Sequence, residues 1–463
     1  MHRVHLDYAN LLEPHVGPRG ISPDRLQEDL AETFTRAYEA VETRRAARDM
    51  GFFDLPYAST SAERVKEVAD GFGQWFEDVV VLGIGGSGLG ATALKDSLLG
   101  PFWNERDDEE RDHFPRLHVV DNPDPATFRQ LLDRLEPART LFNVVSKSGS
   151  TAETMAAYLV VRDWMEEAVG AEHARGHFLF TTDPESGALR QIADAEEIPS
   201  LPVPPNVGGR FSVLSPVGLL PAAVCGVDVD AVLRGARNMD ERCRTDVLAE
   251  NPAGILATLL HAADVELGRP IHVLMPYADG LRTTALWFQQ LWAESLGKAR
   301  SLSGEPRPTG PTPVASLGAS DQHSLLQLLM EGPHDKVVLL VAVGERGQDV
   351  LIPRRHPEIS SLAYLGGHTL GELLDTECRA TAEALRRAER PNATLTLDGV
   401  REETMGQLFM LFEIATVYAG ALYDVDPLDQ PGVELGKRLT YGLMGREGYE
   451  APDLDPGDPR WRI

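Results

Sequence analysis

The stretch DVVVLGIGGSGLGATALKDSLLG, residues 78–100, predicts the fold class. It begins with a short run of valine and leucine that ends at a glycine, the pattern of a strand buried on both faces. A glycine-rich turn follows, and the residues after it open a helix. A buried strand followed at once by a helix is the unit from which parallel α/β sheets are built.

The same unit recurs along the chain. Short apolar runs at 117–122, 140–146 and 177–183 predict further strands, with helical patterns between them. Strands that alternate with helices indicate a mainly parallel sheet that is covered on both faces. Upstream of this region, residues 1 to about 50 carry apolar residues at helical spacing, and a second helical stretch runs to Phe76.

The α/β pattern starts again in the second half of the chain. Two helical stretches cover roughly 229–266, and apolar runs at 271–277, 336–343 and 393–399 predict strands with long helices between and after them. We therefore predict two α/β/α sandwiches in tandem with a helical C-terminal tail. The expected boundaries are an N-terminal helical segment at 1–75, a first α/β domain at 76–228, a second at 229–425 and the tail at 426–463.

Composition and charge exclude several classes of protein. The 463 residues suggest two or three domains, and a hydrophobic content of 43% is enough to bury large cores. No apolar run approaches the ~18 residues of a membrane span, and the first residues do not resemble a signal peptide. A net charge of −27 opposes nucleic acids and anionic membranes as partners. The widely separated Cys225, Cys243 and Cys378 indicate a reducing compartment, so we expect a cytoplasmic protein.

The glycine-rich turn GIGGSG at 83–88 fits the spacing G-x-G-x-x-G of dinucleotide-binding turns. That match alone is weak. Dinucleotide-binding turns are followed about 20 positions later by an acidic residue at the end of the next strand, whereas here the next predicted strand ends only at Asp121, which is further away. Glycines still let the backbone approach a ligand, and the following helix offers free N–H groups to an anion. An anion site, a nucleotide site and a tight turn without a ligand all stay open here.

The turn SKSGST at 146–151 is a sharper candidate for a phosphate site. It carries four hydroxyls and one ammonium between a predicted strand and a predicted helix, where open α/β sheets bind ligands. Hydroxyl and N–H groups can surround phosphate oxygens, and Gly149 permits a tight curve. Capping of the next helix by Ser150 or Thr151 is the alternative, but a cap needs only one hydroxyl. The missing G-K-[ST] ending excludes a Walker loop.

Glu294 lies in the apolar and aromatic stretch QQLWAESLGK at 289–298, which is expected to be helical. Gln290 precedes it by four positions, so the two side chains share a helix face. A carboxylate in apolar surroundings is suited to act as a general base near neutral pH. A surface Glu paired with Lys298 explains the same window equally well, so both interpretations stay open.

Three further segments contain groups that could assist catalysis. Arg210, after two glycines in GGRFS, could reach a developing negative charge. His323, in DQHS, could shuttle protons at neutral pH, although a lone histidine after a turn is more often a cap or a packing residue. The segment DQPGVELGK at 429–437 opens the last predicted helix and contains Gln430 and Lys437.

Together, GIGGSGLG, SKSGSTAET, GGRFS, QQLWAESLGK, DQHS and DQPGVELGK resemble the motifs of the glucose-6-phosphate isomerase family and occur in that family's order. The resemblance covers roughly residues 75 to 445. It implies two tandem sugar-isomerase (SIS) domains and the reversible conversion of glucose 6-phosphate to fructose 6-phosphate, in glycolysis and gluconeogenesis. No metal or cofactor is implied, and the sequence shows no clustered set of metal ligands.

The resemblance also implies a role for each matching residue. Glu294 would move the proton between C1 and C2, Arg210 would stabilise the enediolate, and His323 and Lys437 would assist ring opening. The residues implied to bind the sugar or its phosphate are Gly86, Ser87, Ser146, Lys147, Ser148, Thr151, Gln290 and Gln430. Because the histidine comes from the neighbouring subunit in this family, the resemblance implies a homodimer.

Other functions remain to be tested against this one. A dual glucose/mannose 6-phosphate isomerase is the nearest, but members of that branch tend to lack the lysines that match Lys147 and Lys437. A non-catalytic sugar-phosphate sensor needs only the phosphate site, whereas Glu294, Arg210 and His323 are all present here. A nucleotide-dependent dehydrogenase would bind NAD(P).

Overall fold

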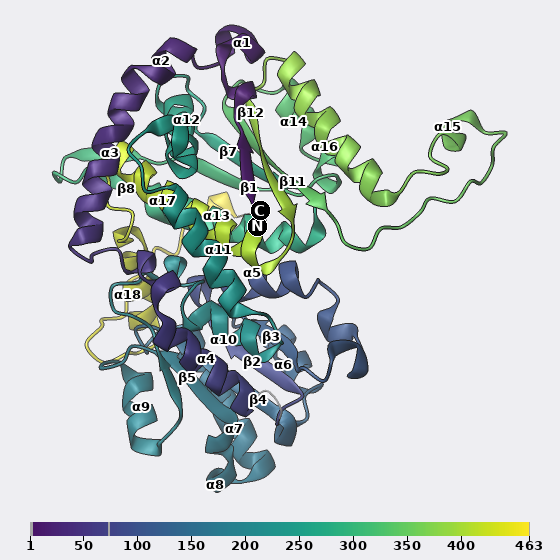
Figure 1. The fold of residues 1–463 in the computed structure, drawn as a ribbon. Helices are drawn as coiled ribbons and strands as arrows, with labels where there is room; N and C mark the ends of the chain where they lie inside the picture. Colours follow the sequence, from purple (N-terminus) through teal and green to yellow (C-terminus); the bar gives the residue numbers. More distant parts are fainter. Residues whose placement is uncertain (1–2, 73–74, 463) are drawn as a thin grey trace.

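The computed structural model describes residues 3–72 and 75–462, which form two five-stranded sheets surrounded by helices (Figure 1). The first sheet has the strand order β3-β2-β4-β5-β6, and all neighbouring strands run parallel. Its central strands are apolar and buried on both faces, as a covered parallel sheet requires. The strands are β2 (Asp78–Leu82), β3 (Arg116–Val120), β4 (Thr140–Ser146), β5 (Phe178–Thr182) and β6 (Ser200–Pro202).

The second sheet has the order β1-β12-β11-β7-β10 and is parallel except for one edge strand. That strand, β1, runs antiparallel to β12. The strands of this sheet are β1 (Val4–Asp7), β7 (Ile271–Pro276), β10 (Thr312–Ala315), β11 (Lys336–Glu345) and β12 (Asn392–Gly399). A separate antiparallel pair consists of β8 (Lys298–Arg300) and β9 (Pro306–Thr309).

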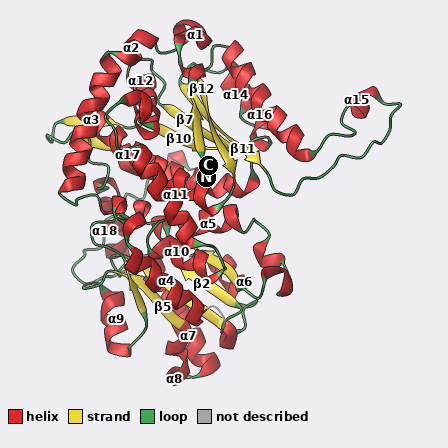
Figure 2. Ribbon diagram, viewed as in Figure 1, coloured by secondary structure: helices red, strands yellow, loops and turns green. Residues whose placement is uncertain are grey.

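Helices cover both sheets and fill the space between them (Figure 2). Those preceding or flanking the first sheet are α1 (Glu13–Val16), α2 (Pro23–Gln27), α3 (Asp29–Ala46), α4 (Ser59–Phe72), α5 (Leu89–Leu98), α6 (Pro125–Leu132), α7 (Ala152–Val169), α8 (Ala171–Ala174) and α9 (Ala188–Glu196). The later ones are α10 (Pro216–Val224), α11 (Val229–Arg242), α12 (Pro252–Val265), α13 (Arg282–Leu296), α14 (Leu326–Glu331), α15 (Ser360–Ala363), α16 (Leu370–Arg387), α17 (Glu402–Leu422) and α18 (Glu434–Leu443). This arrangement confirms the predicted α/β class with mainly parallel sheets and a helical C-terminal region.

Helix α17 forms the centre of the core. It packs against α11, α12, α13 and α3, and 89% of its most apolar window is buried inside the protein. By length and composition it is the one helix of the described residues that could cross a membrane, but this burial is typical of a core helix. Its Glu413 is fully buried, and burial raises the pKa of that carboxyl well above its ordinary value, which favours the neutral form of the side chain.

One local prediction differs from the structure. The sequence predicts a helical start, but Val4–Asp7 pair with β12 at the edge of the second sheet. The four-residue strand is too short for its period to be distinguished within a helical pattern. In the charged run at 104–112 most side chains are exposed, whereas Arg111 is buried and donates to the backbone carbonyl of Phe114. Long arginine side chains can bury their stems and bind carbonyls.

The elements that meet between the two sheets bring distant parts of the chain together. Helix α13 from the second α/β region packs against α5 from the first, and also contacts the 3-10 turns η5 (Gly85–Ser87) and η10 (Gly209–Phe211). Both turns belong to segments that follow strands of the first sheet. The helix bearing Glu294 therefore meets the glycine-rich turn and the segment bearing Arg210.

Candidate active site

The glycine-rich turn packs its backbone directly on the segment that carries Arg210. A Cβ atom added at Gly86 would lie 2.3 Å from the carbonyl carbon of Gly209, so a side chain there cannot be accommodated. Gly85 has a φ of +58° and a Cβ there would come within 3.1 Å of Gln290 Nε2. The glycines of this turn thus allow close contact with two other segments. These two contacts account for the glycines at positions 85 and 86 without requiring a bound nucleotide.

The hydroxyl-rich turn at 146–151 has its side chains directed toward one another. Ser146 Oγ and Thr151 Oγ1 are 2.9 Å apart, and Ser148 Oγ lies 3.4 Å from the same Thr151 atom. Gly149 has a φ of +62°, which gives the tight curve predicted from the sequence. Thr151 is the N-cap residue of α7, yet its side chain makes no capping hydrogen bond. The capping alternative therefore does not account for these hydroxyls.

Lys147 extends from this turn to the segment 205–207. Its ammonium donates to the carbonyl oxygens of Pro205 at 2.6 Å and Val207 at 2.8 Å. Burial lowers the pKa of Lys147, while the nearby Asp183 carboxylate opposes that shift. The lysine thus joins the hydroxyl-rich turn to the chain that leads directly into Gly208, Gly209 and Arg210.

Arg210 is the most extensively bonded side chain of the cluster, and it is 1% exposed. Its Nε donates to Ser295 Oγ at 2.7 Å, and its Nη1 donates to Glu294 Oε1 at 3.1 Å and Gln430 Oε1 at 3.0 Å. Its Nη2 donates to the backbone carbonyls of Pro427 and Asp429. Burial lowers the pKa of the guanidinium and the neighbouring carboxylates oppose this shift, so it remains cationic at neutral pH.

Glu294 projects from the last turn of α13 into this cluster. Its side chain is 26% exposed, and its second oxygen accepts a 3.1 Å hydrogen bond from Gln290 Nε2. The predicted shared helix face of Gln290 and Glu294 is therefore present. The alternative pairing with Lys298 does not occur, because the Lys298 ammonium donates to the backbone carbonyl of Glu294 at 2.8 Å.

These contacts form one continuous cluster. The segment 205–210 binds Lys147 at its first half and presents Arg210 to Glu294 at its end. The glycine-rich turn packs against the same segment and against Gln290. Two stretches that lie far apart in the sequence, the turn at 146–151 and the end of α13, are thereby linked through a few residues.

Two members of the cluster were not predicted as site residues from the sequence. Ser295 bonds to Arg210, and Lys298 donates to three backbone carbonyls with a side chain that is 6% exposed. A signal for Lys298 was present in the sequence, because a cation just after a helix commonly binds the last carbonyls of that helix. No pattern in the sequence marked Ser295.

Two predicted residues lie outside the cluster in the described chain. His323 is exposed in the 3-10 turn η13 (Ser320–His323) and makes no hydrogen bond with Glu294 or Arg210. Lys437 is exposed on α18 and forms an ion pair with Glu434 of the same helix at 2.9 Å. Gln430, by contrast, is brought to Arg210 as described above. A single chain therefore assembles most, but not all, of the predicted site.

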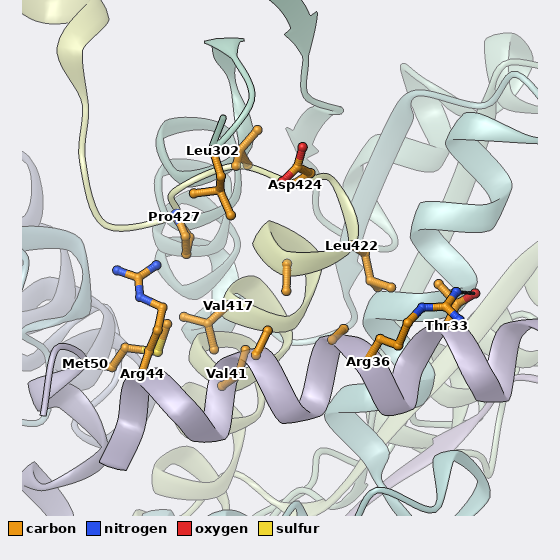
Figure 3. A pocket seen from close by; sticks show the side chains of 14 residues that line it. Thr33, Arg36, Val41, Arg44, Met50, Leu302, Val417, Leu422, Asp424 and Pro427 are labelled. Carbon is orange, nitrogen blue, oxygen red and sulfur yellow. Dashed lines mark hydrogen bonds between the residues drawn. The ribbon is translucent and has the colours of Figure 1, made fainter. Parts of the chain in front are cut away.

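The cavity shown in Figure 3 is lined by none of the predicted site residues. It has a volume of about 340 Å³ and is bounded by α3, the end of α17 and the turn that follows. Its link to the cluster is Pro427, whose carbonyl binds Arg210. Among the described residues, no group of three or more His, Cys, Asp or Glu side chains is arranged to hold a metal ion.

The chain matches known proteins over nearly its whole length. The family model described as phosphoglucose isomerase matches residues 62–446. A glucose-6-phosphate isomerase of Rubrobacter xylanophilus is 48% identical over 97% of this chain and 99% of its own length. A glucose-6-phosphate isomerase of Carboxydothermus hydrogenoformans is 42% identical over 96% of this chain and 95% of its own.

Solved structures agree with these matches. A crystal structure of a hypothetical protein from Thermus thermophilus is 37% identical with a TM-score of 0.86. It covers 96% of this chain and 100% of its own. A glucose-6-phosphate isomerase from Chlamydia trachomatis has a TM-score of 0.74 at 24% identity, covering 89% of this chain and 78% of its own, and shares the fold.

Proposed function

This chain belongs to the phosphoglucose isomerase family, and we propose that the cluster around Glu294 and Arg210 carries out the family's reaction, the reversible isomerisation of D-glucose 6-phosphate and D-fructose 6-phosphate. The observation that carries the proposal is a buried guanidinium in contact with a carboxylate, joined through one segment to a hydroxyl-rich turn. We place this activity in cytoplasmic glycolysis and gluconeogenesis.

The turn at 146–151 would bind the phosphate group. Ser146, Ser148 and Thr151 supply hydroxyls that face one another, and backbone N–H groups at the start of α7 add further donors. Lys147 supplies a positive charge, which a dianion needs in a chain of net charge −27. The turn binds the end of the sugar at which no bond changes, and so orients the other end.

Glu294 would transfer the proton once the sugar ring is open. From the aldose it removes the proton on C2, and the electrons of that C–H bond form a C1–C2 double bond while charge moves to the C1 oxygen. The Arg210 guanidinium stabilises the resulting cis-enediolate. The hydroxyl proton on O2 then passes to O1. Glu294 returns its proton to C1, where the electrons of the C1–C2 double bond form the new C–H bond, and the electron pair left on O2 forms the C2 carbonyl of the ketose. The substrate is isomerised without net oxidation, so the reaction needs no redox cofactor.

Gln290, Gly86 and Ser87 would contact the sugar itself. The side-chain oxygen of Gln290 is buried and has no hydrogen-bond partner in the described part of the chain, which leaves an acceptor available for a sugar hydroxyl. Gly86 and Ser87 lie in the turn that touches this glutamine's helix. Gln430, already bonded to Arg210, would line the same site.

We further propose that the enzyme acts as a homodimer in which His323 serves the site of the neighbouring subunit, with Lys437 also assisting ring opening. His323 is exposed and outside its own chain's cluster. An arm at residues 347–369 extends far from the body of the protein around α15 (Figure 1) and exposes Leu351 and Tyr364. Exposed apolar side chains on an extended arm favour contact with another protein surface.

The arm and His323 arise from the same place in the fold. Arg346, at the base of the arm, donates to the carbonyl of Tyr277, and Gln322 next to His323 donates to the hydroxyl of that tyrosine. The arm also carries Arg354 and Arg355, which suit the acidic surface of a second copy. An arm that binds a partner would therefore bring η13 to the interface.

Turnover of fructose 6-phosphate by the purified wild-type protein tests the proposed function. We expect formation of glucose 6-phosphate, followed with a coupled assay, and turnover of mannose 6-phosphate that is at least about 100-fold lower in kcat/KM. Absence of turnover together with binding of the sugar phosphate would instead indicate a sensor. Comparable turnover of mannose 6-phosphate would indicate the dual-specificity enzyme, and NAD(P) binding in a fluorescence titration would indicate a dehydrogenase.

The Lys147→Ala variant should bind substrate weakly while catalysing at a near-normal rate. Loss of one charge-assisted contact to the phosphate corresponds to a KM raised by about 10- to 100-fold, with kcat changed less than about threefold. Steady-state kinetics with fructose 6-phosphate measure both constants. Lys66→Ala, which removes a surface lysine paired with Asp230, is the control. A lower kcat with an unchanged KM would contradict the phosphate role.

A further inference from the structure

Lys298 follows α13 directly and points its ammonium into the protein. The ammonium has three N–H donors, and three backbone carbonyls accept from it: Glu294 at 2.8 Å, Ser295 at 2.9 Å and Asp429 at 2.9 Å. The side chain is 6% exposed, and burial lowers the pKa of its ammonium. A buried cation held by three carbonyls in this way connects two segments that are distant in the sequence.

Both of these segments also bind Arg210. At the end of α13, the side chains of Glu294 and Ser295 accept from the guanidinium. On the other side, the carbonyls of Pro427 and Asp429 accept from it. Lys298 and Arg210 therefore join the same two elements, one through the backbone of α13 and the other through its side chains. Asp429 uses its single carbonyl oxygen for both cations.

We infer that Lys298 is a positioning residue for the proposed proton transfer, because its ammonium ties the last turn of α13 to the segment 427–430 and so sets the placement of Glu294 against Arg210. This inference rests on the proposed function of the cluster. The last four carbonyls of a helix have no partner within the helix, and Lys298 satisfies two of them at the turn that carries Glu294. Without that tie, the general base and the guanidinium would lose their fixed separation.

The contacts argue for a backbone tie rather than a simple ion pair. Lys298 does not contact the Glu294 carboxylate, and its nearest carboxylate oxygen is Asp429 Oδ1 at 3.5 Å. That carboxylate is more than half exposed, so its attraction is screened by water. The proposal therefore concerns geometry. Displacement of a catalytic group by about 1 Å can cost about 100-fold in rate.

The Lys298→Met variant tests the inference, because it keeps the apolar stem and removes the donors. We expect kcat for fructose 6-phosphate to fall by about 100-fold while KM changes less than about threefold, since the turn at 146–151 is untouched. Lys298→Arg restores a cation with several donors, so its kcat should be at least about tenfold higher than that of Lys298→Met. Lys298→Gln keeps two N–H donors and should lower kcat by an intermediate factor. This variant provides the test if the Met variant does not fold.

Lys336→Met is the matched control, because Lys336 is also largely buried and pairs with Asp335 at the start of β11 in the second sheet, whereas Lys298 belongs to the separate β8–β9 pair. It should keep kcat within about twofold of wild type. Circular dichroism and a thermal melt of each variant identify the temperature at which all are folded, and kinetics are compared there.

Several outcomes would overturn the inference. A folded Lys298→Met or Lys298→Gln variant with wild-type kcat would show that the tie does not set the catalytic geometry. A lower melting temperature alone would assign Lys298 to stability, and an Arg variant as impaired as the Met variant would remove the case for a cationic tie. In each of these outcomes the wild-type protein is still an active isomerase. If the proposed function itself were wrong, the wild-type protein would have no isomerase activity.

Discussion

The Glu294→Gln variant is expected to lose nearly all isomerase activity while it still binds substrate. The amide keeps the size of the side chain and can still accept from Arg210 at the position of Oε1, now 3.1 Å from the guanidinium. It cannot take up the proton from C2, so the step that defines the reaction is blocked. We expect kcat to fall by about 10³- to 10⁴-fold, with KM within about threefold of wild type.

Steady-state kinetics and an independent binding measurement separate the two effects. Isothermal titration with glucose 6-phosphate should give a Kd for the variant close to that of the wild-type enzyme. Glu266→Gln is the matched control, because Glu266 is similarly exposed and pairs with Arg25 at 2.7 Å, just beyond the end of α12 and outside the cluster. Retention of a tenth or more of the wild-type kcat by Glu294→Gln would assign the base to another residue.

Mixing two inactive variants should restore activity if His323 acts across the subunit interface. Homodimers of His323→Ala lack the histidine at both sites, and homodimers of Glu294→Gln lack the base at both. In a mixed dimer, one site pairs the intact Glu294 of one chain with the intact His323 of the other. Random reassembly makes half of the dimers mixed, so about a quarter of the wild-type activity should return.

The alternative predicts no recovery. If His323 served its own chain, every site in the mixed dimer would lack either the histidine or the carboxylate. The subunits are exchanged by dilution and reconcentration, and size-exclusion chromatography with light scattering confirms that dimers re-form. A chain that remains monomeric at working concentration would contradict the proposed homodimer directly. Shortening the arm at 347–369 to a Gly-Ser turn should then favour the monomer and lower activity in parallel.

Much of the fold could be predicted from the sequence because strands and helices have local signatures. The valine-rich run at 79–82 and the runs at 140–146 and 336–343 are largely apolar, which is typical of strands buried on both faces. Alternation with amphipathic helices then favours a parallel sheet. The edge strand Val4–Asp7 was missed, because its partner β12 lies almost four hundred residues away and no local period reveals that pairing.

The candidate site likewise contains residues that could be predicted from the sequence and residues that could not. The hydroxyl-rich turn at 146–151 was predictable as a candidate binding turn, because its four hydroxyls, its lysine and its glycine lie within six consecutive residues between a strand and a helix. Glu294 was ambiguous, because a glutamate four positions before a lysine is as typical of a surface pair as of a buried base. In the structure the surface pair between Glu294 and Lys298 is absent, because the Lys298 ammonium donates to backbone carbonyls instead.

Residues that are neighbours along the chain were enough to predict the alternation of most strands and helices, the parallel α/β class and the hydroxyl-rich turn at 146–151, but not the edge strand Val4–Asp7. The packing of distant segments places Arg210 against Glu294, buries Lys298 between α13 and the segment 427–430, and leaves His323 exposed. Those outcomes depend on which surfaces exclude water when the two sheets come together, and burial at a long-range contact is a property of the packed chain.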